Sequence, residues 1–109
     1  MNNKTIVIKL GGSVLENKDT SLADVVELYH RGFHPVLVHG GAAKVNEWLN
    51  RLNLVSKVVN GERLTDEPAL DVVTAVLAGL VNKEITATLL TLGVKAVGIS
   101  GVDGALVEG

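Results

Sequence analysis

The sequence predicts an α/β fold with a mainly parallel sheet. Short stretches of β-branched and aliphatic residues alternate along the chain with amphipathic helical patterns, as they do in α/β proteins. Hydrophobic residues make up 47% of the 109 positions, but only one Trp, one Tyr and one Phe are present. A core of Val, Leu, Ile and Ala is typical of parallel sheets that are buried on both faces. The length suits one domain with one hydrophobic core.

The first strand and the first helix are predicted near the amino terminus. Thr5–Leu10 is β-branched and apolar, and it is followed by Gly11 and Gly12, which indicates a buried strand ending in a tight turn. A helical stripe comes next, with apolar side chains at the spacing i, i+3, i+4 and i+7: Leu22, Val25, Val26 and Tyr29. Gly32 stands where a helix commonly ends.

A second strand and helix repeat this arrangement. Pro35–His39 is predicted as a strand that ends at Gly40 and Gly41. The next helical stripe begins almost on these glycines: Val45, Trp48, Leu49 and Leu52. Two parallel strands joined by a helix form a βαβ unit, whose crossover should be right-handed.

The middle of the chain predicts a β-hairpin. Val55–Val59 and Glu62–Thr65 are β-prone and flank Asn60–Gly61. Asn-Gly is the strongest short hairpin signal, because both turn residues need positive φ. Thr65 is then placed to cap a following helix.

The last third of the chain predicts two helices and a strand. One helix spans residues 66–82, and a second carries Ile85, Leu89 and Leu92 and ends at Gly93. Val94–Ser100 is predicted as a third core strand. Helix 66–82 has almost no polar face, so its outer side should be covered, either by further chain or by a second copy.

Composition and charge argue against several classes of function. The formal net charge is −2 without a basic run, so a nucleic-acid surface is not expected. There is no cysteine for a disulfide or a thiolate metal site. The three histidines lack the spacing and the carboxylate partners of a metal site. Neither a signal peptide nor a stretch of roughly 20 apolar residues is recognised, so we expect a cytoplasmic protein that does not bind membranes.

Two glycine-rich strand ends are the first candidate site. Lys9 precedes Gly11, Gly12 and Ser13 at the carboxyl end of the first strand, where open α/β sheets bind ligands. Gly40 and Gly41 occupy the corresponding place after the second strand, directly before a helix. Backbone N–H groups from both ends could bind one anion, which suggests a phosphate. Taken alone, the first piece fits an ordinary turn with a solvated lysine equally well.

Other polar residues fit ordinary roles at least as well. His39 is interpreted as a structural histidine bonded to a loop. Arg63, on the hairpin, could grip a carboxylate over the crevice, although a solvated arginine is the more common arrangement. Asn82 and Lys83 could cap or solvate the start of a helix. The loop Ser100–Gly104 fits a substrate loop and an ordinary turn equally well.

Together these residues resemble the acetylglutamate kinases of the amino-acid-kinase family. The motifs that carry the resemblance occur in order over nearly the whole chain: Ile8–Ser13 (IKLGGS), His39–Gly41, Asn46–Glu47, Asn60–Gly61 with Arg63 and Thr65–Asp66, Ala78–Gly79, Val81–Lys83 and Ser100–Gly104. Each motif is short, but their joint occurrence is specific. The lysine with two glycines is common to the wider family, whereas Arg63 and the Val-Asn-Lys stretch narrow the choice.

The resemblance implies a three-layer αβα sandwich around a mainly parallel sheet, the amino-acid-kinase or carbamate-kinase-like architecture. It implies phosphorylation of the γ-carboxylate of N-acetyl-L-glutamate by ATP with magnesium, in arginine biosynthesis. By matching positions, Lys9 would neutralise charge on the transferring phosphoryl group, and Arg63 would hold the substrate α-carboxylate beneath a hairpin lid. Backbone N–H groups of four glycines would line the crevice: Gly11, Gly12, Gly40 and Gly41.

The resemblance also implies that residues 1–109 are the N-terminal, substrate-binding portion of an amino-acid-kinase domain, without the ATP-binding half. The chain alone is therefore expected to be inactive. The family often has a third glycine after His-Gly-Gly, where this chain has Ala42. Alanine keeps the N–H group but disfavours positive φ, so this loop should differ slightly.

Other functions remain open at this point. A related kinase that phosphorylates carrier-protein-bound aminoadipate shares most of these motifs. A non-enzymatic module that binds acyl-amino acids is the alternative from another class. For helix 66–82, the resemblance favours a homodimer in which this helix crosses its copy.

Overall fold

The computed structural model describes residues 4–11, 18–54, 57–59, 62–64 and 67–105. The chain runs through strands, α-helices, one π-helix and one 3₁₀-helix in this order: β1 (Thr5–Leu10), α2 (Lys18–His30), β2 (His34–His39), α3 (Ala42–Arg51), β3 (Lys57–Val59), β4 (Glu62–Leu64), α4 (Glu67–Thr74), the π-helix η1 (Ala75–Val81), α5 (Asn82–Thr91) and the 3₁₀-helix η2 (Asp103–Ala105).

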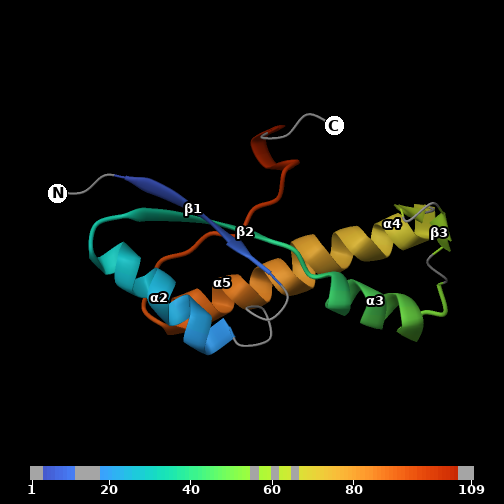
Figure 1. The fold of residues 1–109 in the computed structure, drawn as a ribbon, viewed down its shortest axis with the longest axis horizontal. Coiled ribbons are helices and arrows are strands. Elements are labelled where there is room, and N and C mark those ends of the chain that lie inside the picture. Colours follow the sequence, from blue (N-terminus) through green and yellow to red (C-terminus); the bar gives the residue numbers. More distant parts are fainter. Residues whose placement is uncertain (1–3, 12–17, 55–56, 60–61, 65–66, 106–109) are drawn as a thin grey trace.

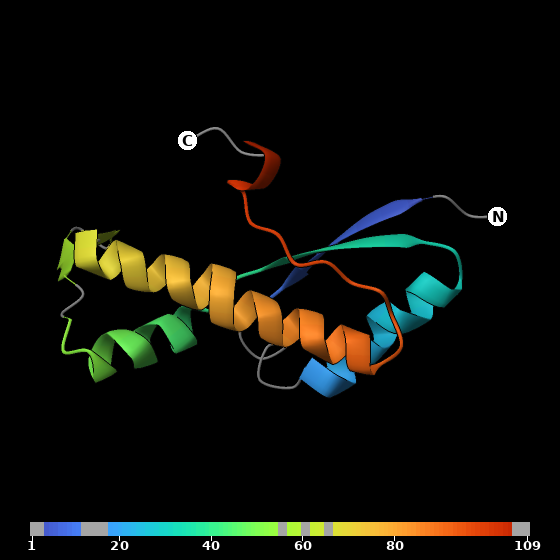
Figure 2. The same cartoon turned by 180° about the vertical axis from the view of Figure 1, so that it is seen from behind.

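β1 and β2 form a parallel pair, as predicted. Their register aligns Thr5 with His34 and Leu10 with His39, so both strands end at the same edge. Side chains alternate along β1, where Ile6, Ile8 and Leu10 are more buried than the residues between them. Helices α2 and α5 lie on one side of this pair (Figures 1 and 2). The predicted α/β class is confirmed, and the described residues supply the sheet and one helix layer.

One contiguous core fills the space between the strands and the helices. Its buried side chains are mainly Val, Leu and Ile, as the composition predicts: Leu10, Leu22, Val25, Val45, Leu49, Ala69, Val76, Val81, Ile85 and Leu89. The predicted stripes of α2 and α3 face this core. The exceptions are Tyr29 and Leu52, which lie near the helix ends and are exposed.

The predicted hairpin is present. β3 and β4 pair antiparallel with Val59 opposite Glu62, which leaves a connection of two residues between them. That spacing fits the predicted two-residue turn. Asn60, Gly61 and the expected cap Thr65 lie outside the described residues.

A single helix replaces the two that the sequence predicts after the hairpin. α4, η1 and α5 follow one another without a break from Glu67 to Thr91, over 25 residues. Val81 and Asn82 both have helical backbone angles. Asn82 therefore lies inside the helix, so the expectation that it caps a helix start is wrong. Neither proline nor a capping side chain interrupts the helix at this point.

This helix is apolar by composition. An 18-residue window has a mean hydropathy of 1.4, and the helix is long enough to cross a membrane; 28% of that window is buried. In this structure the helix packs against α2 and α3. It serves here as the central helix of the fold.

The third predicted strand is not formed. Val94–Ser100 keeps a strand-like alternation of burial but makes no ladder with β2. Residues of both segments line a pocket of about 370 Å³. The carbonyl groups of Gly98 and Ile99 instead accept hydrogen bonds from the side chains of Lys83 and Asn82. These side chains occupy acceptors that a strand ladder would use.

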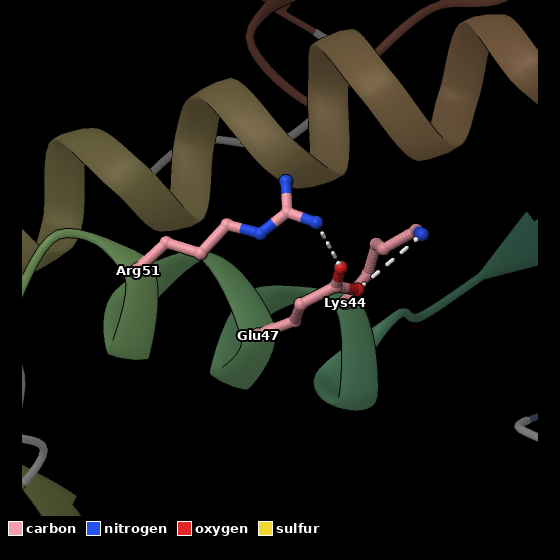
Figure 3. Close-up of polar contacts among 3 residues, drawn as sticks. All are labelled: Lys44, Glu47 and Arg51. Carbon is pink, nitrogen blue, oxygen red and sulfur yellow. Dashed lines mark hydrogen bonds and ion pairs between the residues drawn. The ribbon is translucent and has the colours of Figure 1, made fainter.

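Charged side chains stabilise the outer face of α3. Glu47 lies between Lys44 and Arg51, with N–O distances of 3.4 and 2.8 Å (Figure 3). The Arg51 guanidinium also lies 4.9 Å from the centre of the Trp48 ring. Exposed i,i+3 and i,i+4 pairs contribute only about 0.2–0.5 kcal/mol each. Their main effect is to favour helix in the segment that follows the second glycine pair.

Candidate active site

The carboxyl ends of β1 and β2 bring the predicted site residues to one edge. Because Leu10 pairs with His39, Gly11 and Gly40 follow at the same level. A Cβ atom at either glycine would meet no heavy atom within 4 Å. Both backbones are therefore open to an approaching ligand. Lys9 is exposed on the sheet face opposite the buried Leu10.

Gly41 is held in a conformation that favours glycine. Its φ is 153° and its ψ is 35° at the N-cap position of α3. A Cβ atom here would lie 2.9 Å from Cδ2 of Leu77 and 3.1 Å from Cγ2 of Val81, both in η1. The glycine thus allows the loop backbone to approach the long helix closely.

The amino end of α3 points its first backbone N–H groups out of the helix beside this loop. No side chain among the described residues caps it, and its first turn holds no acidic residue. The first N–H groups of a helix have no partner within the helix and carry a partial positive charge. The loop and helix end therefore present the backbone donors that an anion site requires.

A buried asparagine connects this edge to a distant segment. The Asn82 amide Nδ2 donates to Nε2 of His39 at 3.1 Å and to the carbonyl of Ile99 at 3.1 Å. Lys83 Nζ donates to Asn82 Oδ1 at 3.1 Å and to the carbonyl of Gly98 at 2.9 Å. We call these five residues the Asn82 cluster. The sequence analysis did not predict this cluster. The signal that could have indicated it is the polar pair Asn82 and Lys83 within an otherwise apolar helix.

His39 has the structural role expected from the sequence. Its Nδ1 lies 2.9 Å from the carbonyl oxygen of Gly40 and donates to it. The ring therefore bridges the glycine loop and Asn82. No described group of three His, Asp or Glu side chains is arranged to hold a metal ion.

The loop Ser100–Gly104 is closed by its own carboxylate. Asp103 Oδ2 accepts from the backbone N–H of Ser100 at 2.6 Å and from its hydroxyl at 3.1 Å. These bonds, the backbone one first, lower the pKa of Asp103, and the charge of Lys83 adds to the effect. This carboxylate therefore stays ionised near neutral pH, beside the Asn82 cluster.

Not all predicted site residues meet at this edge. The backbone of Arg63 lies in β4, opposite Val58. The hairpin sits beyond α3, at the start of α4, away from the ends of β1 and β2 (Figures 1 and 2). The structure therefore does not bring Arg63 next to Lys9. Gly12 and Ser13 lie outside the described residues.

Related proteins with known names resemble the chain over its full extent. It is 61% identical over 109 residues to an acetylglutamate kinase of Dehalococcoides mccartyi, covering all of this chain and 40% of the relative. It is 47% identical over 108 residues to the acetylglutamate kinase of Heliobacterium modesticaldum, covering 96% and 37%. The chain thus spans about 40% of the length of these curated relatives.

The fold and the family agree with this similarity. A crystal structure of smu.665 from Streptococcus mutans superposes with a TM-score of 0.72 at 30% identity, covering 83% of this chain and 37% of that one. The model of the amino acid kinase family matches residues 4–109. The chain belongs to the amino acid kinase family.

Proposed function

We propose that the protein carrying this chain phosphorylates the γ-carboxylate of N-acetyl-L-glutamate with ATP, as a step of arginine biosynthesis. The observation that carries the proposal is the 61% identity, over every residue of this chain, to a protein named acetylglutamate kinase. The two open glycine ends beside Lys9 support it. We further propose a cytoplasmic location and no nucleic-acid or membrane partner.

Residues of this chain would act on the phosphoryl group by position and charge. A carboxylate oxygen attacks the γ-phosphorus, the bond to the ADP oxygen breaks, and an acyl phosphate forms. Negative charge is spread over the transferring group during this step. Lys9 and the backbone N–H groups of Gly11, Gly40 and Gly41 would face that charge, and no covalent nucleophile is needed. Gly12 is proposed for the same role.

ATP would supply the phosphoryl group, and magnesium would accompany it. Kinase magnesium ions are usually held by phosphate oxygens and one or two carboxylates. The described residues offer no cluster of three such side chains. We therefore assign no side chain of this chain to magnesium.

The direct test is formation of the acyl phosphate by the full-length protein. Hydroxylamine converts an acyl phosphate to a hydroxamate, which is measured with N-acetylglutamate and ATP as substrates. Carrier-bound aminoadipate serves as the competing acceptor, and calorimetric titration with ATP tests for a module without kinase activity. A folded full-length protein that gives no hydroxamate from N-acetylglutamate refutes the proposal.

Arg63→Ala is expected to raise the KM for N-acetylglutamate about 10- to 100-fold, as loss of a charge-assisted hydrogen bond commonly does. The substrate α-carboxylate does not react, so kcat and the KM for ATP should change little. Steady-state kinetics on both substrates measure this. Arg31→Ala is the matched control, because Arg31 is an exposed arginine paired only locally with Glu27. A rise in the KM for ATP instead would remove the carboxylate-binding role.

We propose that the protein is a homodimer through the long helix. Val73 is a natural first choice for an outward position, but the structure places it partly buried against the core. Leu70, one turn earlier, is 54% exposed. Leu70→Glu is expected to convert the dimer to a monomer, because a charge at a two-fold contact is repeated by its copy. Sedimentation velocity of the folded full-length protein measures this.

Leu90→Glu is the matched control for the dimer. Leu90 is 53% exposed on the same continuous helix, but it lies outside the 66–82 stretch. This variant should sediment like wild type. If the wild type is a monomer, or if Leu70→Glu stays dimeric, the helix is not the interface.

A further inference from the structure

Asn82 is the one buried polar residue among the described positions. It is 8% exposed in a helix whose neighbouring turns carry aliphatic side chains. Burying an amide is unfavourable unless its hydrogen bonds are made. Here the amide is satisfied by partners from β2, from segment 94–99 and from Lys83. Such an arrangement holds these three parts in one fixed geometry.

The partners determine which way the amide points. The carbonyl of Ile99 can only accept, so it requires the NH₂ side of Asn82. The Lys83 ammonium can only donate, so it requires the oxygen side. Both requirements select the same orientation, which also directs an N–H group at His39. The Ile99 carbonyl and the Lys83 ammonium, which lie outside the glycine loop, thus set the amide orientation.

The amide orientation in turn determines the tautomer of His39. Because Asn82 donates to Nε2, the ring proton must be on Nδ1. Nδ1 is then the donor that the Gly40 carbonyl needs. Every polar atom along this path is satisfied by one tautomer. The path links segment 94–99 to the glycine loop without a gap.

The helix also contacts the loop backbone directly. Leu77 and Val81 approach Gly41 closely, and Val81 immediately precedes Asn82. On the other side of Asn82, a Cβ atom at Gly98 would collide with Asn82 Oδ1. The asparagine therefore lies between the end of β2 and segment 94–99, and it approaches the backbone of Gly98 closely.

We propose that Asn82 is a positioning residue for the phosphoryl-binding backbone at Gly40 and Gly41, acting through His39. The inference rests on the proposed kinase function. It assigns a role in catalysis to Asn82, whose side chain touches neither substrate. Backbone N–H groups stabilise a transition state only when they are aimed at it, and small displacements reduce the rate strongly. Asn82 holds these N–H groups in position from within the long helix.

Two substitutions of His39 in the full-length protein each remove one of the two hydrogen bonds that its ring makes, either to Asn82 or to Gly40. His39→Asn keeps a donor near Nδ1 for Gly40 but cannot reach Asn82. His39→Gln keeps an acceptor near Nε2 for Asn82 but loses the bond to Gly40. We expect each of them, and Asn82→Leu, to lower kcat about 10- to 100-fold with a much smaller change in the KM for ATP.

A double-mutant cycle tests whether the residues act in series. If Asn82 acts through His39, the double variant Asn82→Leu with His39→Leu loses no more kcat than either single variant. Thr86→Val is the matched control, because it removes a partly buried hydrogen bond to the backbone carbonyl of Asn82 and none of the hydrogen bonds of the cluster side chains. Its kcat should stay close to wild type.

Nuclear magnetic resonance without substrate separates this proposal from the kinase function. The ¹⁵N shifts of the His39 ring should report the Nδ1–H tautomer in wild type and a mixture in Asn82→Leu, with moved amide signals at Gly40 and Gly41. If the wild-type protein is inactive, the kinase function is refuted. The spectra then still show whether Asn82 sets the His39 tautomer and the backbone at Gly40 and Gly41. Unchanged spectra, unchanged kcat, multiplying losses in the cycle, or an equal loss in Thr86→Val would each overturn the proposal. If Asn82→Leu does not fold, the two His39 variants decide it.

Discussion

Lys9→Ala is expected to lower kcat of the full-length protein by about 10²- to 10³-fold, the usual loss when one charge-stabilising group is removed. Lys9 is exposed at the carboxyl end of β1, one residue before the buried Leu10 and beside the open Gly11. Its charge is assigned to the transition state, so the effect should appear in the rate more than in the KM for N-acetylglutamate. Steady-state kinetics of hydroxamate formation measure both constants.

Lys4→Ala is the control for this result. Lys4 is an exposed lysine that precedes the other end of the same strand, where its carbonyl accepts from the backbone N–H of His34. Removing its side chain should leave kcat unchanged. If Lys9→Ala also leaves kcat unchanged, Lys9 is a solvated charge and has no catalytic role.

Gly41→Ala is expected to lower the free energy of unfolding more than Gly40→Ala. Its φ of 153° is a conformation that L-residues adopt at a cost of about 1–3 kcal/mol. The added methyl group must also displace Leu77 or Val81. We therefore expect a lower free energy of unfolding in urea, together with reduced kcat because the loop moves relative to the phosphoryl group.

Gly40→Ala is the control for Gly41→Ala. It tests whether replacing any glycine of this loop with alanine lowers the free energy of unfolding. A Cβ atom at Gly40 meets open space, and this residue is not among those with positive φ. Its free energy of unfolding should equal that of wild type. Equal destabilisation by both substitutions would show that the close approach of Gly41 to the helix is unimportant.

The sequence predicted the local elements well because each has a local cause. Gly11 and Gly40 follow the ends of the two strands, and the apolar stripes of α2 and α3, which include Leu22 and Val45, face the core as expected. The hairpin follows from two residues between paired strands. These features depend on neighbours a few positions apart, which periodicity and turn chemistry report directly.

The errors concern interactions between distant residues. Where a third strand was predicted, the carbonyls of Ile99 and Gly98 accept hydrogen bonds from the side chains of Asn82 and Lys83, at least 15 positions away. The helix break was expected at Asn82 because polar residues often begin helices, whereas burial against β2 keeps it inside one. In the site, the strand register places Gly11 and Gly40 at the same level, but nothing local indicated the role of Asn82.

The π-helix η1 makes the long helix unequally sensitive to changes in its length. Seven residues, Ala75–Val81, follow the wider hydrogen-bond pattern between two α-helical halves. A π-helical turn takes up one extra residue by widening, so the α-helices on either side keep nearly the orientation of one uninterrupted helix. Deleting one residue there would restore the ordinary pattern and leave Asn82 facing His39. Inserting a further residue would rotate α5 by about 100° relative to α4, the angle per residue at 3.6 residues per turn, and would turn Asn82 away from His39. This segment should therefore tolerate a single deletion better than a single insertion.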